Sequence, residues 1–546
     1  MVAVASAELS LVPSGGSAAS GWKESFRGFR RRHRIALIAV GATLPLYVIW
    51  WAFLATGGGD LAAQEAWARF AADHGKSAYN LFWYGGMHTA NYSLISPYLM
   101  AAVGVRTVTA LSGVAAAWLV SELLVRTGIR RPLWPALLAS LAVWCNVASG
   151  RTTFALGVAF GLAACLALVR ERRLTVAVLC GALSTMASPV AGLFLVVAGA
   201  GYFFVRDWPR AAALLAPPVL IVATTTVLFP FKGEQPMPYD RVFPPVLFSA
   251  ALILAAPRGW RVLRWGAGAF AVGTVLTYLI ASPIGTNVER LAELFAPAAL
   301  LAALLATPAL ARLRRLLLAV ALVLSSAWVV KKTADDLVEY TAVPKWAADT
   351  SGVVRELRRL GADRGRVEVV PARDHREAAA LSPYVNMARG WNRQLDVERG
   401  RLFYDGTFSS TTYRAWLDQW AVGFVVLPLG KPDGPAQAEA KLVASGPAWL
   451  EPVWQDAHWK VFKVKNAVPL VSKPAKVVRS SGSDVVLRVP RRGPVTVRLV
   501  YSPWLRAEGG ACLKQHGEFT RLWVPRPGTY KISSGYGPAR SRPSSC

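Results

Sequence analysis

The sequence predicts a polytopic α-helical membrane protein with about 11 transmembrane helices and a C-terminal region outside the membrane. The chain of 546 residues is 54% hydrophobic and has a mean hydropathy of +0.35. Its apolar runs approach the length of about 20 residues that a helix needs to cross the hydrocarbon layer. Backbone polar groups must be satisfied inside lipid, so these runs are expected to be helices. After Lys331 the runs stop and a water-soluble composition begins.

Residues 1–34 form a polar N-terminus that is expected to be disordered and cytoplasmic. Residues 1–20 are rich in Ala, Ser and Gly, which is typical of disorder. Residues 23–34 (KESFRGFRRRHR) are strongly basic and directly precede the first apolar run. Basic flanks stay on the cytoplasmic side, and the polar lead is too long for a signal peptide, so the first span is expected to be retained.

Eleven spans are expected within a transmembrane domain at residues 35–331. Clusters such as RTGIRR at 126–131 and RLRR at 312–315 alternate with connections that carry few basic residues. This alternation predicts a cytoplasmic N-terminus and an extracytoplasmic C-terminal region. Ser188-Pro189 predicts a break between two short helices. The expected spans are 35–55, 106–125, 132–148, 153–169, 174–187, 190–205, 211–229, 244–257, 265–281, 294–311 and 316–330.

The formal net charge is +29. A charge this positive occurs in nucleic-acid-binding proteins and also in membrane proteins with basic connections. Much of this charge lies in the clusters between spans, where Arg and Lys set the topology and meet anionic lipid headgroups. We therefore expect the lipid bilayer of the plasma membrane as a partner and no nucleic acid.

The long polar segment at residues 56–97 is the first extracytoplasmic loop. Three glycines precede Asp60, and a helix is expected from Asp60 to about Asp73. Its residues Ala63, Ala66, Trp67 and Phe70 share one face, which is expected to lie on the bilayer surface. Asp60 has two compatible interpretations, a helix N-cap and a general base.

The aromatic cluster that follows contains four rings. It is typical of the interfacial belt of membrane proteins more than of a sugar-stacking platform. Its members are Tyr79, Phe82, Trp83 and Tyr84.

The other candidate site residues lie in outward connections. Basic side chains there can stabilise the negative charge of a leaving phosphate, and Arg suits this role because it binds two oxygens. For Arg290 an ion pair with Glu289 or Glu293 is the alternative role. Polar side chains can contact substrate hydroxyls. The candidates are His88, Asn91, Arg151, Lys232, Arg241, Asn287 and Arg290. The histidines lack metal-ligand spacing, so no metal ligands are predicted from the residues.

The C-terminal region is expected to hold two parts. Residues 332–465 alternate helix and strand patterns, which predicts an α/β domain. Residues 466–546 contain short alternating runs bounded by Pro and Gly, which predict a small β-sandwich or a β-extension of the α/β domain. Cys512 and Cys546 lie in this part, and an oxidising compartment would permit a disulfide between them.

The first loop text DLAAQ…FWYGGMHTANYSLISPYL, with SGRTTFALG and MASPVAG, resembles the GT-C superfamily of integral-membrane glycosyltransferases. The resemblance covers mostly residues 35–330. It implies a polyprenyl-phosphate sugar donor and a cell-envelope glycan or lipid acceptor on the extracytoplasmic side. The family's loop acid falls on Asp60, although the paired acids common in the family are absent because Leu61 follows. A divalent metal, Mg²⁺ or Mn²⁺, is a further candidate.

Two other function classes stay open. A non-catalytic envelope protein could bind glycans or partners through outer tryptophans such as Trp391, Trp416, Trp420, Trp454 and Trp459, most of which are expected to be core residues. A transporter would need ionisable side chains inside the spans, and the predicted span centres hold almost none.

Overall fold

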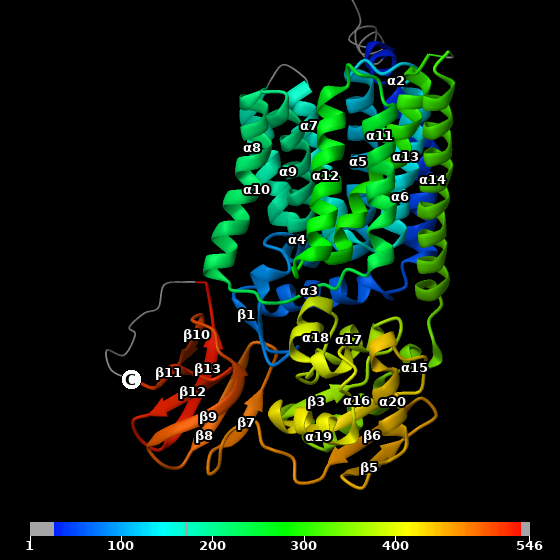
Figure 1. The fold of residues 1–546 in the computed structure, drawn as a ribbon. Coiled ribbons are helices and arrows are strands. Elements are labelled where there is room, and N and C mark those ends of the chain that lie inside the picture. Colours follow the sequence, from blue (N-terminus) through cyan, green and yellow to red (C-terminus); the bar gives the residue numbers. More distant parts are fainter. Residues whose placement is uncertain (1–26, 170–172, 309, 537–546) are drawn as a thin grey trace, which may run out of the picture.

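The computed structural model describes residues 27–169, 173–308 and 310–536, and within them a bundle of apolar helices stands on a mixed α/β and β domain (Figure 1). Each of the eleven expected spans overlaps one helix of the bundle. These helices are α2 (Arg34–Ile49, continued by η1, Trp50–Leu54), α5 (Val105–Arg126), α6 (Leu133–Ala148), α7 (Thr152–Val169), α8 (Leu174–Ala187), α9 (Pro189–Phe204), α10 (Trp208–Leu228), α11 (Phe243–Ala255), α12 (Arg261–Leu279), α13 (Glu289–Ala306) and α14 (Arg312–Thr341).

The bundle is that of a membrane protein. Among the described residues, six helices are long and apolar enough to cross a membrane: α2 with η1, α5, α7, α10, α12 and α14. Helices α6, α8 and α9 are apolar but shorter. That all eleven cross the membrane stays a prediction. Ser188 has an extended backbone between α8 and α9, which confirms the predicted break.

Large apolar side chains cover the outside of the bundle, and small residues lie between its helices. Leu220 and Val272, for example, are 64% and 61% exposed. Inside, a Cβ added to Gly113 would lie 2.4 Å from the Tyr47 ring, and one added to Gly157 would lie 2.7 Å from Ala191. Close contacts at small residues are the way in which helices associate in lipid.

The first loop fills the junction between the bundle and the outer domains (Figure 1). It contains α3 (Asp60–His74), β1 (Tyr79–Asn80), β2 (Met87–His88) and η2 (Thr89–Asn91), and α4 (Ser96–Val103) begins at its end. The predicted helix from Asp60 is therefore confirmed, with its end one residue beyond the expected Asp73.

The expected surroundings of this loop were wrong. The apolar face of α3 does not lie open to a bilayer, since Ala63, Ala66, Trp67 and Phe70 are 1–5% exposed and pack with residues of the α/β domain. The aromatic cluster is no interfacial belt either. Phe82, Trp83 and Tyr84 lie in the same core, and Tyr79 lies in the core of the β-sandwich. The loop thus supplies apolar side chains to both outer domains.

The α/β part follows α14, which continues through the predicted boundary at residues 331 and 332. A four-stranded sheet has the order β3-β4-β6-β5, with β3 and β4 parallel and the other pairs antiparallel. The elements are α15 (Lys345–Ala348), α16 (Ser351–Arg359), η5 (Ala362–Arg364), β3 (Arg366–Val369), α17 (Arg376–Leu381), α18 (Arg393–Arg399), η6 (Arg401–Phe403), α19 (Ser410–Gln419), β4 (Val422–Pro428), η7 (Gly434–Ala436), α20 (Gln437–Ala444), β5 (Leu450–Gln455) and β6 (Trp459–Val464).

The last part is a β-sandwich. Sheets of order β10-β13-β8-β7 and β11-β12-β9 enclose one apolar core, in which Leu487, Val497, Leu522 and Ile532 are at most 1% exposed. Its strands are β7 (Lys476–Ser480), β8 (Asp484–Val489), β9 (Gly493–Val500), β10 (Leu505–Ala507), β11 (Cys512–His516), β12 (Phe519–Val524) and β13 (Gly528–Ser534). Cys512 begins β11, whereas Cys546 lies outside the described residues, so their pairing stays a prediction.

Candidate functional site

Asp60 is the first residue of α3 and not its N-cap, so the capping interpretation was wrong by one position. The N-cap is Gly59, whose φ of 62° and ψ of −134° suit glycine alone, and no side chain caps the helix. The Gly59 N–H donates to the carbonyl of Asp374 at 2.8 Å, and its carbonyl accepts from the Trp391 indole at 3.0 Å. The outer domain therefore holds the backbone that carries Asp60.

The Asp60 carboxylate faces Arg290 of α13. Its Oδ2 lies 3.5 Å from Nη2 of Arg290, and its side chain keeps 33% of its exposure. The sequence-based alternative that Arg290 pairs with Glu289 or Glu293 was wrong. The guanidinium of Arg290 also lies 5.4 Å from the centre of the Phe154 ring. The carboxylate is thus held by one cation and still reaches solvent.

Tyr92 lies near this pair and stacks on Trp67 of α3, with ring centres 5.1 Å apart. Burial raises the pKa of its phenol well above the usual value, and the nearby Asp60 carboxylate adds to this effect. Tyr92 is therefore a neutral hydroxyl next to the acid.

Arg151 reaches the same place from the connection between α6 and α7. Its Nη1 lies 2.6 Å from Oε2 of Glu293, and its Nη2 lies 3.9 Å from Oδ2 of Asp336. Burial disfavours its charge, but Glu293, Asp336 and Asp60 together raise the pKa of Arg151 above its usual value. Arg151 also lies close enough to Arg290 for the two guanidinium groups to repel each other. Two adjacent arginines favour an anion between them.

Lys332 of α14 contacts the two glutamates of α13. Its Nζ lies 2.6 Å from Oε2 of Glu289 and also contacts Glu293. Arg241 stands at the rim, with its Nη1 3.7 Å from Oε2 of Glu289 and its side chain 45% exposed. We use the name charged cluster for the seven residues Asp60, Arg151, Glu289, Arg290, Glu293, Lys332 and Asp336.

The cluster lies where the bundle meets the outer domains. α13 begins at Glu289, α7 begins just after Arg151, and α14 leaves the bundle near Lys332. Figure 1 shows these helix ends on the side of α3 and the α/β domain. Glu293, Arg151 and Lys332 form tight pairs, whereas the Asp60–Arg290 and Asp336–Arg151 pairs are longer. Of the four carboxylates in the cluster, Asp60 has the most exposed side chain, 33% against 26% for Asp336 and at most 10% for the two glutamates.

His88 and Asn91 are not part of the cluster. The Nε2 atom of His88 lies 2.8 Å from Oγ of Ser502, so this side chain contacts the β-sandwich. Burial lowers the pKa of His88 to about 4, and the ring is neutral at physiological pH. The Asn91 amide lies 3.5 Å from the Pro230 carbonyl. Their predicted contact with substrate remains untested.

The two remaining candidates lie in connections between helices of the bundle. Lys232 is exposed between α10 and η3 (Tyr239–Arg241), and its charge acts on Glu398 of α18. Asn287 lies in η4 (Gly285–Val288), directly before α13. Of the sequence candidates, the structure thus brings Asp60, Arg151 and Arg290 together, with Arg241 at the rim.

Sequence reasoning missed the contribution of α14. Lys332, Asp336 and Tyr340 follow each other at intervals of four residues, which places them on one face of a helix. This four-residue spacing is visible in the sequence, but the change of composition at Lys331 was interpreted as a domain boundary and not as a continuing helix.

A divalent metal has no evident ligand set here. Among the described residues, no three His, Cys, Asp or Glu side chains gather as a metal site requires. The carboxylates of the charged cluster are instead engaged by Arg and Lys. The chemistry proposed below therefore uses the protein's own side chains, and a metal stays an untested expectation.

Comparison with known proteins finds a family match over the end of the chain and six similar chains among solved structures. Residues 472–546 match a domain of unknown function, DUF8823. No relative is found among curated proteins. A cryo-EM structure of a mutant of arabinofuranosyltransferase AftD from Mycobacteria is 15% identical, with a TM-score of 0.47 over 84% of this chain and 43% of that one. A second AftD structure has the same identity and a TM-score of 0.45 over 84% and 41%. The chain thus spans about two fifths of the length of AftD.

Proposed function

We propose that the protein is a membrane glycosyltransferase that moves a sugar from a polyprenyl-phosphate donor to a glycan or lipid acceptor of the cell envelope. The observation that carries the proposal is the partly exposed Asp60 carboxylate, 3.5 Å from Arg290, with Arg151 in the same cluster. In this proposal the three side chains act as a base and two phosphate-binding cations at the end of an apolar bundle, where a lipid-linked donor and a water-soluble acceptor can both arrive.

The reaction assigns one role to each group. Asp60 accepts the proton of the acceptor hydroxyl, which is otherwise a weak nucleophile at neutral pH. The acceptor oxygen forms a bond to the anomeric carbon of the sugar, and the bond from that carbon to the phosphate oxygen breaks. The polyprenyl phosphate leaves with the bonding electron pair. Arg290 and Arg151 stabilise the charge that develops on the phosphate.

The charge pattern of the bundle supports an extracytoplasmic site. Basic clusters such as RTGIRR lie at the connections that point away from α3, while the charged cluster lies on the side of the outer domains (Figure 1). By the positive-inside rule, the outer domains and the site then face the exterior of the plasma membrane.

The location of the ionisable groups favours a transferase over a transporter. Asp60 and Arg151 lie in connections, and Glu289 and Arg290 lie at the first turn of α13. An ion-coupled carrier needs such groups inside the spans along a pathway. The ionisable groups lie at one end of the bundle, which suits a reaction at the membrane surface better than transport through the spans.

The test is Asp60→Asn, measured as transfer of labelled sugar from a polyprenyl-phosphate donor in membranes that contain the protein. We expect turnover to fall by about 10²–10⁴-fold, since a positioned base contributes that much, with expression unchanged. Asp73→Asn is the matched control, because Asp73 is an exposed acid in the last turn of the same helix. Equal turnover in Asp60→Asn and wild type would rule out the assignment of the base.

A further inference from the structure

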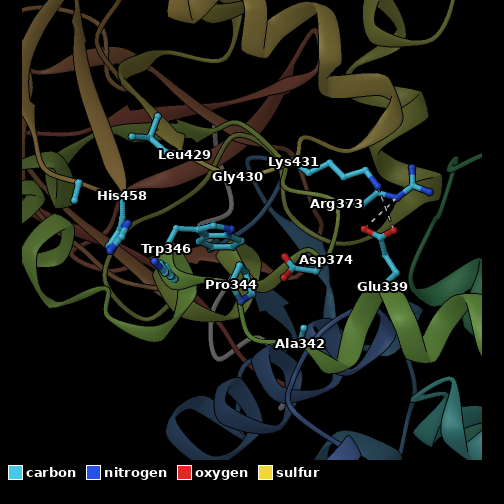
Figure 2. Close-up of a pocket in the computed structure, with 12 residues that line it drawn as sticks. Glu339, Ala342, Pro344, Trp346, Arg373, Asp374, Leu429, Gly430, Lys431 and His458 are labelled. Carbon is cyan, nitrogen blue, oxygen red and sulfur yellow. Dashed lines mark hydrogen bonds and ion pairs between the residues drawn. The ribbon is translucent and has the colours of Figure 1, made fainter.

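A cavity of about 550 Å³ lies in the α/β domain beside the end of α14 (Figure 2). Its size is within the range of about 300–1,000 Å³ that is usual for small-molecule sites. The polar side chains around it come from α14, from α15, from the segment before α17 and from the segments after β4 and β5. The lining includes Glu339, Trp346, Arg373, Asp374, Lys431 and His458.

The lining presents hydrogen-bond donors and acceptors together. The Glu339 carboxylate lies 3.8 Å from Nε of Arg373 and 3.4 Å from Nζ of Lys431, as Figure 2 shows. These pairs are loose, and Arg373 and Lys431 are 43% and 70% exposed. Each of the three groups therefore keeps bonding capacity for a ligand.

The mixture of acidic and basic side chains favours some classes of ligand over others. A phosphate would meet the Glu339 carboxylate among its cations, and a divalent cation would meet Arg373 and Lys431. A neutral sugar suits the mixture, because each of its hydroxyls can donate to a carboxylate and accept from an ammonium or guanidinium group.

A rigid indole edge forms one wall. A Cβ added to Gly430 would lie 2.5 Å from Nε1 of Trp346, so the backbone at Gly430 packs directly on this edge. The Trp459 indole donates to the Trp346 carbonyl at 3.0 Å and helps to fix the residue. The wall thus keeps its position without a bound ligand, which lowers the entropic cost of binding.

The cavity also lies next to the proposed reaction site. Asp374 lines it, and the carbonyl of Asp374 accepts from the N–H of Gly59, the residue before Asp60. Glu339 follows Asp336 of the charged cluster by three residues on α14, a rise of about 4.5 Å. The cavity and Asp60 are therefore neighbours, linked through Gly59 and through one turn of α14.

We propose that this cavity binds a short, neutral saccharide stretch of the glycan acceptor, next to the unit whose hydroxyl is glycosylated. The inference rests on the proposed function for the identity of the ligand as an acceptor. It assigns to the outer domain the selection of acceptors that are longer than one sugar.

The test fills the cavity from an exposed position. Ala457 lines the cavity and is exposed, so Ala457→Trp adds bulk there without disturbing a core. Ala348→Trp is the matched control, since Ala348 is exposed on α15 and is not part of the lining. The full chain in lipid nanodiscs is titrated with size-fractionated oligosaccharides, which mild acid releases from the envelope polysaccharide of the producing strain. We expect Ala457→Trp to bind them at least about tenfold more weakly than wild type and the control.

Asp60→Asn separates this inference from the proposed function. We expect this variant to bind the oligosaccharides like wild type while its transfer activity is lost. If wild type binds none of them, or if Ala457→Trp binds them equally well, the cavity assignment is overturned, whatever the activity of Asp60→Asn. If binding behaves as expected but Asp60→Asn transfers sugar normally, the cavity assignment stands and the assignment of the base fails.

Discussion

Arg290 has the least tightly bound charge among the cations of the cluster. Its contact with Asp60 is 3.5 Å long, whereas Arg151 and Lys332 each lie 2.6 Å from a glutamate. A loosely paired guanidinium can turn to a substrate phosphate at little cost. We therefore assign the main phosphate contact to Arg290, with Arg151 held in place by Glu293.

We expect Arg290→Gln to lower sugar transfer by roughly 10²–10³-fold, the usual loss when one group that stabilises transition-state charge is removed. Arg290→Lys should lose less, because it keeps the charge but not the two-point contact. Arg69→Gln, an exposed arginine on α3, serves as the control. The measurement is kcat with a saturating polyprenyl-phosphate sugar. A kcat for Arg290→Gln within twofold of the control would contradict the phosphate role.

The sequence predicted part of this site for a physical reason. Charge alternation assigns a side of the membrane to each connection, so Asp60, Arg151 and Arg290 were expected at the same side. Charge alternation does not show which connections are neighbours in space. His88 contacts the β-sandwich and Asn91 contacts the segment after α10, and neither contact could be predicted in this way. Lys332 and Asp336 were missed because a helix that leaves the membrane keeps its periodicity while its composition changes.

Element by element, the sequence predicted helix α3 and its apolar face but not what covers that face. A hydrophobic period of 3.6 residues shows that a face is buried, and a bilayer and a protein core satisfy it equally. Trp67 and Phe70 pack against the α/β domain, whose folding pattern was also evident from the sequence. The contact between the two required the three-dimensional arrangement.

The start of α3 depends on Gly59. Its backbone conformation is closed to other residues, and an added Cβ would lie 2.7 Å from the Tyr340 ring. We expect Gly59→Ala to cost about 1–3 kcal/mol of stability and to displace Asp60, with loss of transfer activity. Gly361→Ala is the matched control, because Gly361 also has a positive φ of 66° but nothing within 4 Å. Thermal unfolding and transfer are measured on both variants, and full activity in Gly59→Ala would contradict this account.

At the scale of the whole molecule, two histidines of the first loop join it to the β-sandwich. His88 contacts Ser502 at 2.8 Å, and the half-buried His74 contacts Ser483 at 3.2 Å. Burial lowers the pKa of His88 from 6.5 to about 4, so the unfolded chain binds a proton in this interval that the folded chain does not. The stabilising contribution of neutral His88 is thus complete above pH 6.5 and is lost as the pH falls toward about 4.

We expect the docking of the sandwich to weaken by up to about 3 kcal/mol within this window, since each pKa unit corresponds to about 1.4 kcal/mol. Hydrogen exchange of β10 and β13 at a pH inside and a pH above the window measures the effect. His88→Gln should reduce the pH dependence. Identical pH profiles of wild type and His88→Gln would argue against His88 as the group that titrates.

The orientation of the bundle decides whether the proposed chemistry is possible, because the donor, the acceptor and Asp60 must share one side of the membrane. The connection from α5 to α6, which carries the basic segment RTGIRR, lies at the end of the bundle opposite the outer domains (Figure 1). Electrostatic attraction to the anionic cytoplasmic leaflet stabilises this orientation by about 1 kcal/mol for each basic residue near it. The basic clusters between the spans all favour the same orientation. The outer domains are therefore expected to face the exterior.

Two matched cysteine variants measure this orientation in intact cells with a membrane-impermeant maleimide. Thr127→Cys lies in the connection from α5 to α6, and Ser445→Cys lies directly after α20, and both positions are exposed. We expect Ser445→Cys to react in intact cells and Thr127→Cys to react only after the membrane is made permeable. The unmodified chain gives the background from its five native cysteines, of which Cys145, Cys165 and Cys180 are buried or half-buried in the bundle. The reverse pattern would place Asp60 in the cytoplasm, where an extracytoplasmic acceptor cannot reach it.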